Sequence, residues 1–400
     1  MELELTPAQK NILEMVRWLA LEKLRPLGLE CDKKGEPLPP DHPFFKEAKA
    51  MGIRMALGGD MGKRRKEMTS KEGPGEMARI GILAAEEIAY GDVGVAISLP
   101  GPGLGGPPVL LMGTPEQQER FFGMLEGDEP RWGAYALTEP GAGSDVARIK
   151  TTCRKEGNYY VLNGTKIFIT NGARATWNVV FATIDPSLGR EGHRVFVVEK
   201  GTPGFYVGKI EKKMGLKASE TAELVFDECR VPVENLLGGE ERYKEKAGFK
   251  AAMETFNLTR PAVAAMGIGI ARAAYEYTRD YFKENYMLSR PIPLYHSIKE
   301  TLNTMKRLLD TARLLCWKAA YMIDYRLPNA KEASMAKAYA PPVCLWVTSK
   351  CVDLLGAEGT LEYHHLVEKC YRDIKVFDIF EGTGQAQRIV ISRRLFSQFE

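Results

Sequence analysis

A strand-forming middle section lies between two helix-forming sections, and this order constrains the fold more than any other feature of the sequence. From about Trp132 to Gly239, short β-prone runs follow one another with turn signals between them and no helical pattern. Strands without intervening helices favour a barrel or sandwich over a Rossmann sheet, so no GxGxxG motif is expected to hold a nucleotide here. The clearest runs are residues 159–162, 166–170, 179–182, 195–198 and 224–226, and Asn163-Gly164 is among the predicted turns.

Both flanking sections have helical patterns. Near the N-terminus, Thr6, Pro7 and Gln9 form a capping-box signature before an apolar helical stripe. After residue 243, three Ala- and Leu-rich segments of more than 20 residues each fit an antiparallel bundle: residues 262–283, 295–325 and 331–355. We therefore predict an α+β multidomain chain. Its parts are an N-terminal helical domain (1–130), a central β-barrel or sandwich domain (131–242) and a C-terminal four-helix bundle (243–400).

Residues 91–111 are rich in glycine and proline, and Asp92 is their only charged residue. Proline removes a backbone donor and glycine costs entropy, so this stretch is not expected to form one uninterrupted helix. An apolar connector and the wall of a pocket explain it equally well.

Composition excludes several classes of function. A net charge of +3 over 400 residues does not indicate nucleic-acid binding, and the basic cluster at 63–66 is expected to be a solvated loop. Seven cysteines without CxxC spacing predict reduced thiols rather than a disulfide framework or a zinc site. The N-terminus has no signal-peptide pattern, and no window holds the ~18 apolar residues of a membrane helix. We expect a cytoplasmic protein without stable membrane insertion.

A carboxylate in the last section is the first candidate for chemistry. Glu381 follows the apolar run 376–380 and precedes Gly382-Thr383-Gly384. Apolar neighbours raise the pKa of a carboxylate and let it act as a base near neutral pH, although a surface Glu at a helix start has the same local sequence. The five histidines are not placed for a hydrolase, because GxSxG is absent, and HExxH is absent too, so no metal is expected.

A second candidate is the loop at residues 135–145, YALTEPGAGSD. Its glycines and serine could present backbone amides and a hydroxyl to a phosphate or a ring carbonyl, but an ordinary turn has the same pattern.

Three motifs in order, TEPGAGSD, NGTKIFITNGA and DIFEGTGQAQR, resemble those of the acyl-CoA dehydrogenase family, and the resemblance covers essentially the whole chain. It implies FAD as cofactor, an acyl-CoA thioester as substrate and a homotetramer built as a dimer of dimers. An electron-transfer flavoprotein is the implied acceptor.

The resemblance also implies roles for single residues. Glu381 matches the base that removes the α-proton while hydride leaves the β-carbon for flavin N5, giving the 2-enoyl thioester. The base's backbone amide and the flavin ribityl 2′-hydroxyl would polarise the thioester carbonyl. Thr259 stands where other members place the base. The positions that match FAD contacts are Tyr135, Leu137, Thr138, Gly143, Ser144, Phe168, Thr170, Thr383 and Gln385. Those that match substrate contacts are Ser144, Arg260 and Gly382.

Some positions depart from the family pattern. Family members commonly have an arginine segment that reaches the FAD pyrophosphate, and this chain has Asn285, Met287 and Leu288 there instead. Asp353 stands at a position that is often glutamine in the family. Arg290 is a candidate substitute for the missing guanidinium. No arginine lies in 91–111, which disfavours a free carboxylate on the substrate.

The acyl group and the reaction type remain open at this point. A straight, branched or cyclic acyl group is compatible with the sequence. The alternatives are 1,4-dehydrogenation of a cyclic enoyl-CoA with Asp92 as a second base, a flavin oxidase or redox-neutral relative, and a non-catalytic acyl-CoA-binding protein.

Overall fold

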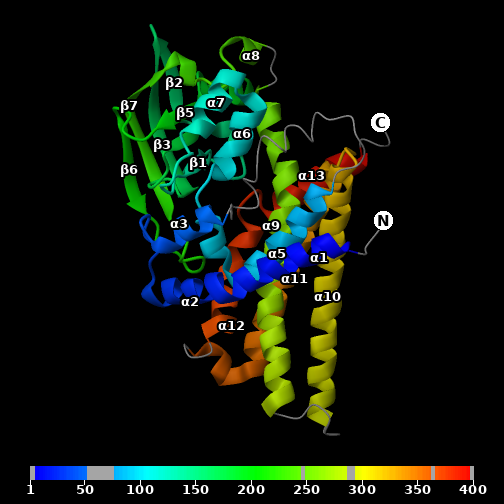
Figure 1. The fold of residues 1–400 in the computed structure, drawn as a ribbon. Coiled ribbons are helices and arrows are strands. Elements are labelled where there is room, and N and C mark those ends of the chain that lie inside the picture. The colour runs from blue at the N-terminus through cyan, green and yellow to red at the C-terminus, as the bar shows by residue number, and fades with distance from the viewer. Residues whose placement is uncertain (1–4, 52–75, 245–247, 286–292, 362–364, 397–400) are drawn as a thin grey trace.

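The structure is a computed structural model that describes residues 5–51, 76–244, 248–285, 293–361 and 365–396. Its three parts follow one another along the chain, and the predicted helix–strand–helix order is confirmed (Figure 1). The long C-terminal helices stand beside the strand domain, and the first helices run across them (Figure 1). The basic cluster at 63–66 lies outside the described residues.

The N-terminal part is helical. Its helices are α1 (Pro7–Leu19), α2 (Arg25–Lys34), α3 (Pro43–Ala50), α5 (Met77–Ile97), α6 (Gly106–Met112) and α7 (Pro115–Gly123). The predicted capping box is present, because Thr6 and Gln9 exchange side-chain and backbone hydrogen bonds at the start of α1. A π-helical turn, Ala20–Leu24, joins α1 to α2 without a break. The backbone of Gly91 approaches this turn so closely that a Cβ there would lie 2.3 Å from Ala20 O.

Helix α5 continues into the Gly/Pro-rich stretch and bends at Asp92. The backbone of Asp92 is extended (φ −158°, ψ 119°), and its Oδ1 accepts a hydrogen bond of 2.8 Å from the Val95 backbone N–H. The carboxylate therefore caps the last turns of the helix, as an N-cap residue does. As predicted, the Gly/Pro stretch is not one helix, since a short turn (Gly103–Gly105) and then α6 follow α5.

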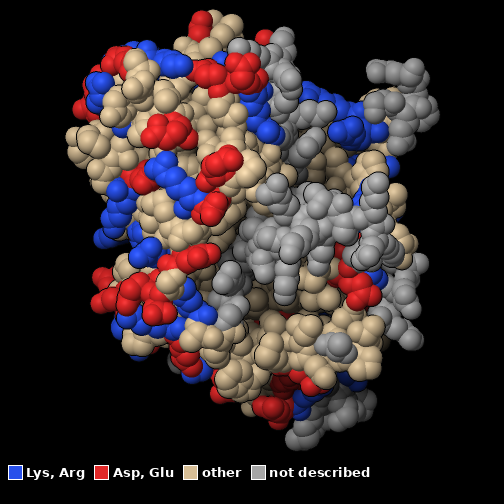
Figure 2. Space-filling model, turned by 45° about the horizontal axis from the view of Figure 1, so that its top comes forward, with Lys and Arg blue, Asp and Glu red and all other residues tan. Residues whose placement is uncertain are grey.

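The middle part is a seven-stranded sheet in which β1-β4-β2-β3-β7-β6 are neighbours in that order, and β5 also pairs with β4. The strands are β1 (Gly133–Ala136), β2 (Thr152–Glu156), β3 (Tyr159–Thr170), β4 (Trp177–Thr183), β5 (His193–Glu199), β6 (Phe205–Ile210) and β7 (Thr221–Pro232). Strands β1 and β4 are parallel, and most other pairs are antiparallel. Acidic and basic side chains alternate over the face of this domain shown in Figure 2, in keeping with the small net charge.

The prediction of a turn at Asn163-Gly164 is wrong. Both residues lie inside β3, where the pairing with β7 shifts register between Leu162 and Gly164. Gly164 has φ 150° and a Cβ there would lie 2.5 Å from Thr151 Oγ1, so glycine serves a bulge rather than a turn.

The C-terminal part contains α8 (Glu241–Lys244), α9 (Gly248–Asn285), α10 (Pro293–Asp324), α11 (Ala330–Leu355), α12 (His365–Ile374) and α13 (Gly384–Phe396). The three long helices that the sequence predicts are α9, α10 and α11, and α9 is longer than predicted. Residues of α5, such as Ala85 and Ala89, belong to the same core as α9 and α11. The first and last parts are therefore packed together.

Ion pairs between distant parts of the chain reinforce this packing. The buried Asp32 carboxylate accepts two hydrogen bonds from Arg372, at 2.7 and 2.5 Å, across 340 positions of sequence.

All seven cysteines are free and buried. No helix among the described residues has the length and hydropathy needed to cross a membrane.

Candidate active site

Glu381 lies in the turn between a 3₁₀ segment (Lys375–Asp378) and α13. Its backbone is left-handed (φ 54°), and Gly382 after it also has a positive φ of 93°. A non-glycine residue adopts this conformation only where its surroundings impose it, and such positions concentrate at functional sites. The turn thus places the predicted base on a specifically held backbone.

The Glu381 side chain is half-buried and faces α9. Its Oε2 accepts a hydrogen bond of 2.8 Å from the hydroxyl of Thr259. Loss of solvent raises the pKa of the Glu381 carboxyl, while the Thr259 hydrogen bond, Lys337 and Arg260 oppose the rise. A carboxylate with a raised pKa that remains ionisable suits a general base.

Two further helices hold the backbone around Glu381. The ammonium of Lys337 in α11 donates to Phe377 O at 2.6 Å and to Gly382 O at 3.3 Å. The side-chain amide of Gln387 in α13 donates to Gly382 O at 3.1 Å. Sequence reasoning missed Lys337 and Gln387; the available signal was a lysine on the Ala-rich face of a predicted helix.

Strand β1 brings a second group of predicted residues toward this turn. The Tyr135 ring packs edge-on against Phe181, with ring centroids 5.2 Å apart. Burial and the nearby Glu381 carboxylate together raise the pKa of the Tyr135 hydroxyl, so the two side chains lie within electrostatic reach. After β1, Leu137 O accepts from Lys166 Nζ at 3.1 Å and Thr138 O from the Ile167 N–H at 2.9 Å. These bonds fix the segment after β1 beside the end of β3.

The glycine-rich loop is anchored at one end and open at the other. Glu139 accepts hydrogen bonds from Lys166 Nζ (2.6 Å) and from the backbone N–H groups of Lys150 (2.6 Å) and Thr151 (3.0 Å). Burial opposes ionisation of Glu139, but these donors outweigh it and hold its pKa below the usual value. Gly143 has open space where a Cβ would stand, and Ser144 is exposed. The loop therefore presents its tip to solvent.

Phe168 and Thr170 lie at the end of β3, next to a second register shift. Phe168 has φ 59°, and 61% of its surface is exposed. Thr170 is half-buried and pairs with Thr221 of β7. An exposed aromatic ring on a left-handed backbone provides a flat apolar surface beside the glycine-rich loop.

The remaining predicted contacts lie on helices. Thr383 caps α13, since its Oγ1 accepts from the Ala386 N–H at 3.2 Å, and Gln385 on the same helix is exposed. Arg260 donates to Asn257 Oδ1 at 3.1 Å, and burial lowers its pKa while Glu381 opposes that shift. The structure thus joins Arg260 to the Glu381 region.

The positions that depart from the family pattern lie elsewhere. Asn285 is exposed and donates to Tyr281 O of its own helix at 2.9 Å, and Asp353 accepts from Lys350 at 2.8 Å on the surface of α11. Met287, Leu288 and Arg290 lie outside the described residues.

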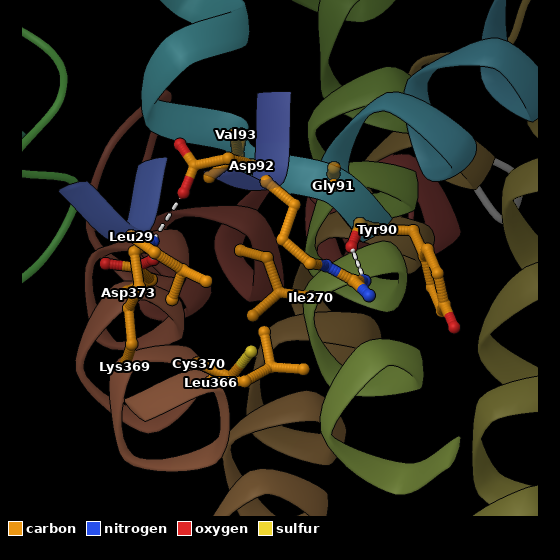
Figure 3. A pocket seen from close by; sticks show the side chains of 12 residues that line it. Leu29, Tyr90, Gly91, Asp92, Val93, Ile270, Leu366, Lys369, Cys370 and Asp373 are labelled. Carbon is orange, nitrogen blue, oxygen red and sulfur yellow. Dashed lines mark hydrogen bonds and ion pairs between the residues drawn. The ribbon is translucent and has the colours of Figure 1, made fainter. Parts of the chain in front are cut away.

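Asp92 does not have the surroundings of a second base. Its Oδ2 accepts from Lys369 Nζ at 2.5 Å, and Lys369 also binds Asp373 at 2.5 Å. These residues line a small pocket with Tyr90 and Arg25, whose guanidinium donates to Tyr90 O (Figure 3). Glu381 is not among the residues that line it. Asp92 instead caps the last turns of α5 and forms an ion pair with Lys369.

The described residues contain no group of His, Cys, Asp and Glu that could hold a metal ion.

Comparison with known proteins defines the class to which this fold and site belong. Three family models match in order: "Acyl-CoA dehydrogenase, N-terminal domain" over 6–127, "middle domain" over 134–229 and "C-terminal domain" over 246–396. The chain belongs to the acyl-CoA dehydrogenase family, whose members bind FAD, and its activity class is that of an oxidoreductase acting on a CH–CH pair.

Individual relatives match over their full length. A short-chain specific acyl-CoA dehydrogenase of Clostridium acetobutylicum is 37% identical, covering 99% of this chain and 100% of the relative. An acryloyl-CoA reductase (NADH) of Anaerotignum propionicum is also 37% identical, covering 100% and 97%. The solved structure of butyryl-CoA dehydrogenase from Megasphaera elsdenii has a TM-score of 0.85 at 37% identity, covering 99% of this chain and 100% of that one.

Proposed function

We propose that the protein dehydrogenates a short, straight-chain acyl-CoA thioester, with Glu381 as the base that removes the α-proton. The observation that carries this proposal is the setting of Glu381: a carboxylate on a left-handed turn, desolvated enough to raise its pKa and oriented by the Thr259 hydroxyl. The short acyl group is supported by the similarity to short-chain and butyryl-CoA dehydrogenases. Those relatives give no support to a branched or cyclic substrate, and the ion-paired Asp92 gives none to 1,4-dehydrogenation.

The residues present fit FAD. A flavin needs a flat apolar surface, hydrogen-bonding groups at its edge and a place for its phosphates. Phe168 offers the exposed ring, Thr138 and Thr170 are half-buried hydroxyl residues, and the open tip at Gly143 and Ser144 offers backbone amides. Tyr135 and Leu137 would line the same site, and Thr383 and Gln385 would contact the adenosine end. When bound, the flavin supplies the acceptor for the hydride from the β-carbon.

The chain's own groups account for the proton chemistry. Ionised Glu381 takes the α-proton. Its backbone N–H donates no hydrogen bond to any described residue, which leaves it available to the thioester carbonyl as that oxygen gains charge. Arg260, Gly382 and Ser144 would contact the substrate. Removal of a general base costs about 10²–10⁴-fold in rate.

The test uses the purified protein loaded with FAD and kept free of oxygen. Butyryl-CoA should bleach the flavin absorption near 450 nm in the wild type. The Glu381→Gln variant should retain FAD, and its flavin should bleach at least about 10²-fold more slowly. Unchanged bleaching in this variant would rule out Glu381 as the base. A homotetramer, and an electron-transfer flavoprotein as acceptor, belong to the same proposal and are tested by solution mass and by reoxidation of the bleached enzyme.

The reverse reaction is a second candidate, because the acryloyl-CoA reductase relative covers the whole chain. Glu381 would then deliver a proton to the α-carbon. Comparing rates with butyryl-CoA and with a 2-enoyl-CoA under a reductant separates the two directions.

A further inference from the structure

Lys337 is a buried charge that the proton chemistry above does not use. Its side chain is fully buried in α11. The other fully or nearly fully buried lysines, Lys166 and Lys369, form ion pairs with Glu139 and with Asp92 and Asp373. Among the described residues, by contrast, no carboxylate oxygen forms an ion pair with Lys337 Nζ. A buried ammonium is costly unless its protons are bound, so its contacts identify what it does there.

Those contacts are two backbone carbonyls on either side of the catalytic turn. Phe377 O lies four residues before Glu381, and Gly382 O directly after it; they accept at 2.6 and 3.3 Å. One ammonium therefore joins both ends of the segment that contains the base. Because Glu381 and Gly382 both have positive φ, this segment needs outside contacts to hold its conformation.

The charge of Lys337 also acts on the base. Charged groups reach this site from several packed elements: Glu381 in the turn, Asp378 before it, Arg260 in α9 and Lys337 in α11, with the Tyr135 hydroxyl from β1. From α13, the Arg388 guanidinium lies beside Asp378, next to Gly384. Burial lowers the pKa of Lys337 to about 8, while Glu381 and Asp378 oppose that shift. Lys337 in turn is one of the groups that limit the rise in the pKa of Glu381.

We propose that Lys337 is a positioning residue for the reaction: its ammonium fixes the turn that carries Glu381 and favours the ionised form of that base. The inference rests on the proposed role of Glu381 as base. It assigns to Lys337 no contact with substrate or cofactor.

The test compares two variants that separate charge from hydrogen bonding. Lys337→Met removes both, whereas Lys337→Gln removes the charge and keeps an N–H donor. The control is Lys331→Met, on the same helix, whose half-buried side chain places its ammonium 3.5 Å from Glu332. For each protein, kcat and kcat/KM for butyryl-CoA are measured from pH 5 to 9 with an artificial electron acceptor, alongside FAD content and melting temperature.

We expect the acid limb of kcat/KM to move to higher pH in both Lys337 variants, because loss of the ammonium raises the pKa of Glu381. In Lys337→Met, kcat should also fall about 10- to 100-fold, the effect of a base displaced by a fraction of an ångström to one ångström. Lys337→Gln should lose less kcat, and Lys331→Met should match the wild type.

Different results would reject the positioning role of Lys337 and the proposed function. An acid limb at the wild-type pH in both Lys337 variants, with or without a lower melting temperature, rejects the positioning role. Should Lys337→Met fail to fold, Lys337→Gln alone decides, because its pH profile reports the charge. If the wild type itself does not turn over any acyl-CoA, the proposed function fails and the inference with it.

Discussion

The hydroxyl of Thr259 donates to Glu381 Oε2 across 2.8 Å, although 122 positions separate the two residues. It thereby joins α9 to the turn before α13. At the position where the family resemblance implies an alternative base, this chain has a hydroxyl that donates to the proposed base.

Replacement of Thr259 by Val should raise the pKa of Glu381, because the hydrogen bond favours the ionised carboxylate. A bond to a charged group contributes about 1.5 kcal/mol or more, so the acid limb of kcat/KM should move up by about one pH unit. Thr278→Val is the matched control, since Thr278 is buried in the same helix and donates to Ala274 O one turn earlier. Identical profiles for both variants would contradict the assignment.

Gly382→Ala should reduce turnover as well as stability. A Cβ at Gly382 would lie 2.4 Å from Gln387 Nε2, and the positive φ of 93° adds strain of about 1–2 kcal/mol. Gly35→Ala has the same kind of strain (φ 75°) with open space around the Cβ, so it should lower the melting temperature and leave kcat unchanged. Equal kcat in both variants would show that the position of Gln387 does not matter to the base.

Glu139→Gln should destabilise the protein by about 3–5 kcal/mol, since it leaves the buried Lys166 ammonium without its partner. Because the folded pKa of Glu139 is lowered, its contribution is present above the ordinary value of 4.5 and disappears as the pH falls through the folded value. The difference from the wild type in urea unfolding should therefore shrink in acid, and FAD retention should fall. Glu228→Gln, which breaks an exposed pair with Arg154, should change neither measurement.

Asp92→Asn should lower stability by about 1–3 kcal/mol and leave kcat close to that of the wild type. The reason is that Asp92 binds Lys369 and the Val95 N–H, and that Glu381 is not among the residues that line the pocket beside Asp92. Normal stability combined with lost turnover would restore Asp92 as a catalytic group.

Local sequence predicted the features that depend on neighbouring residues. The capping box at Thr6 and the long helices α9, α10 and α11 follow from short-range patterns, and Glu381 stood out by its apolar flank. That flank is only partly enclosed, since Phe377 is buried and Ile379 is exposed. The desolvation of the carboxylate therefore depends on tertiary packing as well.

Other features could not be read from local sequence. The hydrogen bonds of Lys337 and Thr259 join α11 and α9 to the turn around Glu381, which lies far from both helices in the sequence. Strand β1 is four residues of mostly small side chains, and β6 is a largely exposed edge strand that contains Gly208, so neither shows an alternating pattern. At Asn163-Gly164 the residue pair is the same for a hairpin turn and a bulge, and only the pairing with β7 separates them.

The ion pairs of Asp32 with Arg372 and of Asp92 with Lys369 span 340 and 277 positions. During synthesis the first helices leave the ribosome long before α12, which carries both partners. The two carboxylates meet these partners only after α12 has been made, because non-local contacts form only after the chain between them is complete. A chain truncated before α12 should therefore be more sensitive to protease than the whole chain, because the buried Asp32 and Asp92 carboxylates would lack these basic partners.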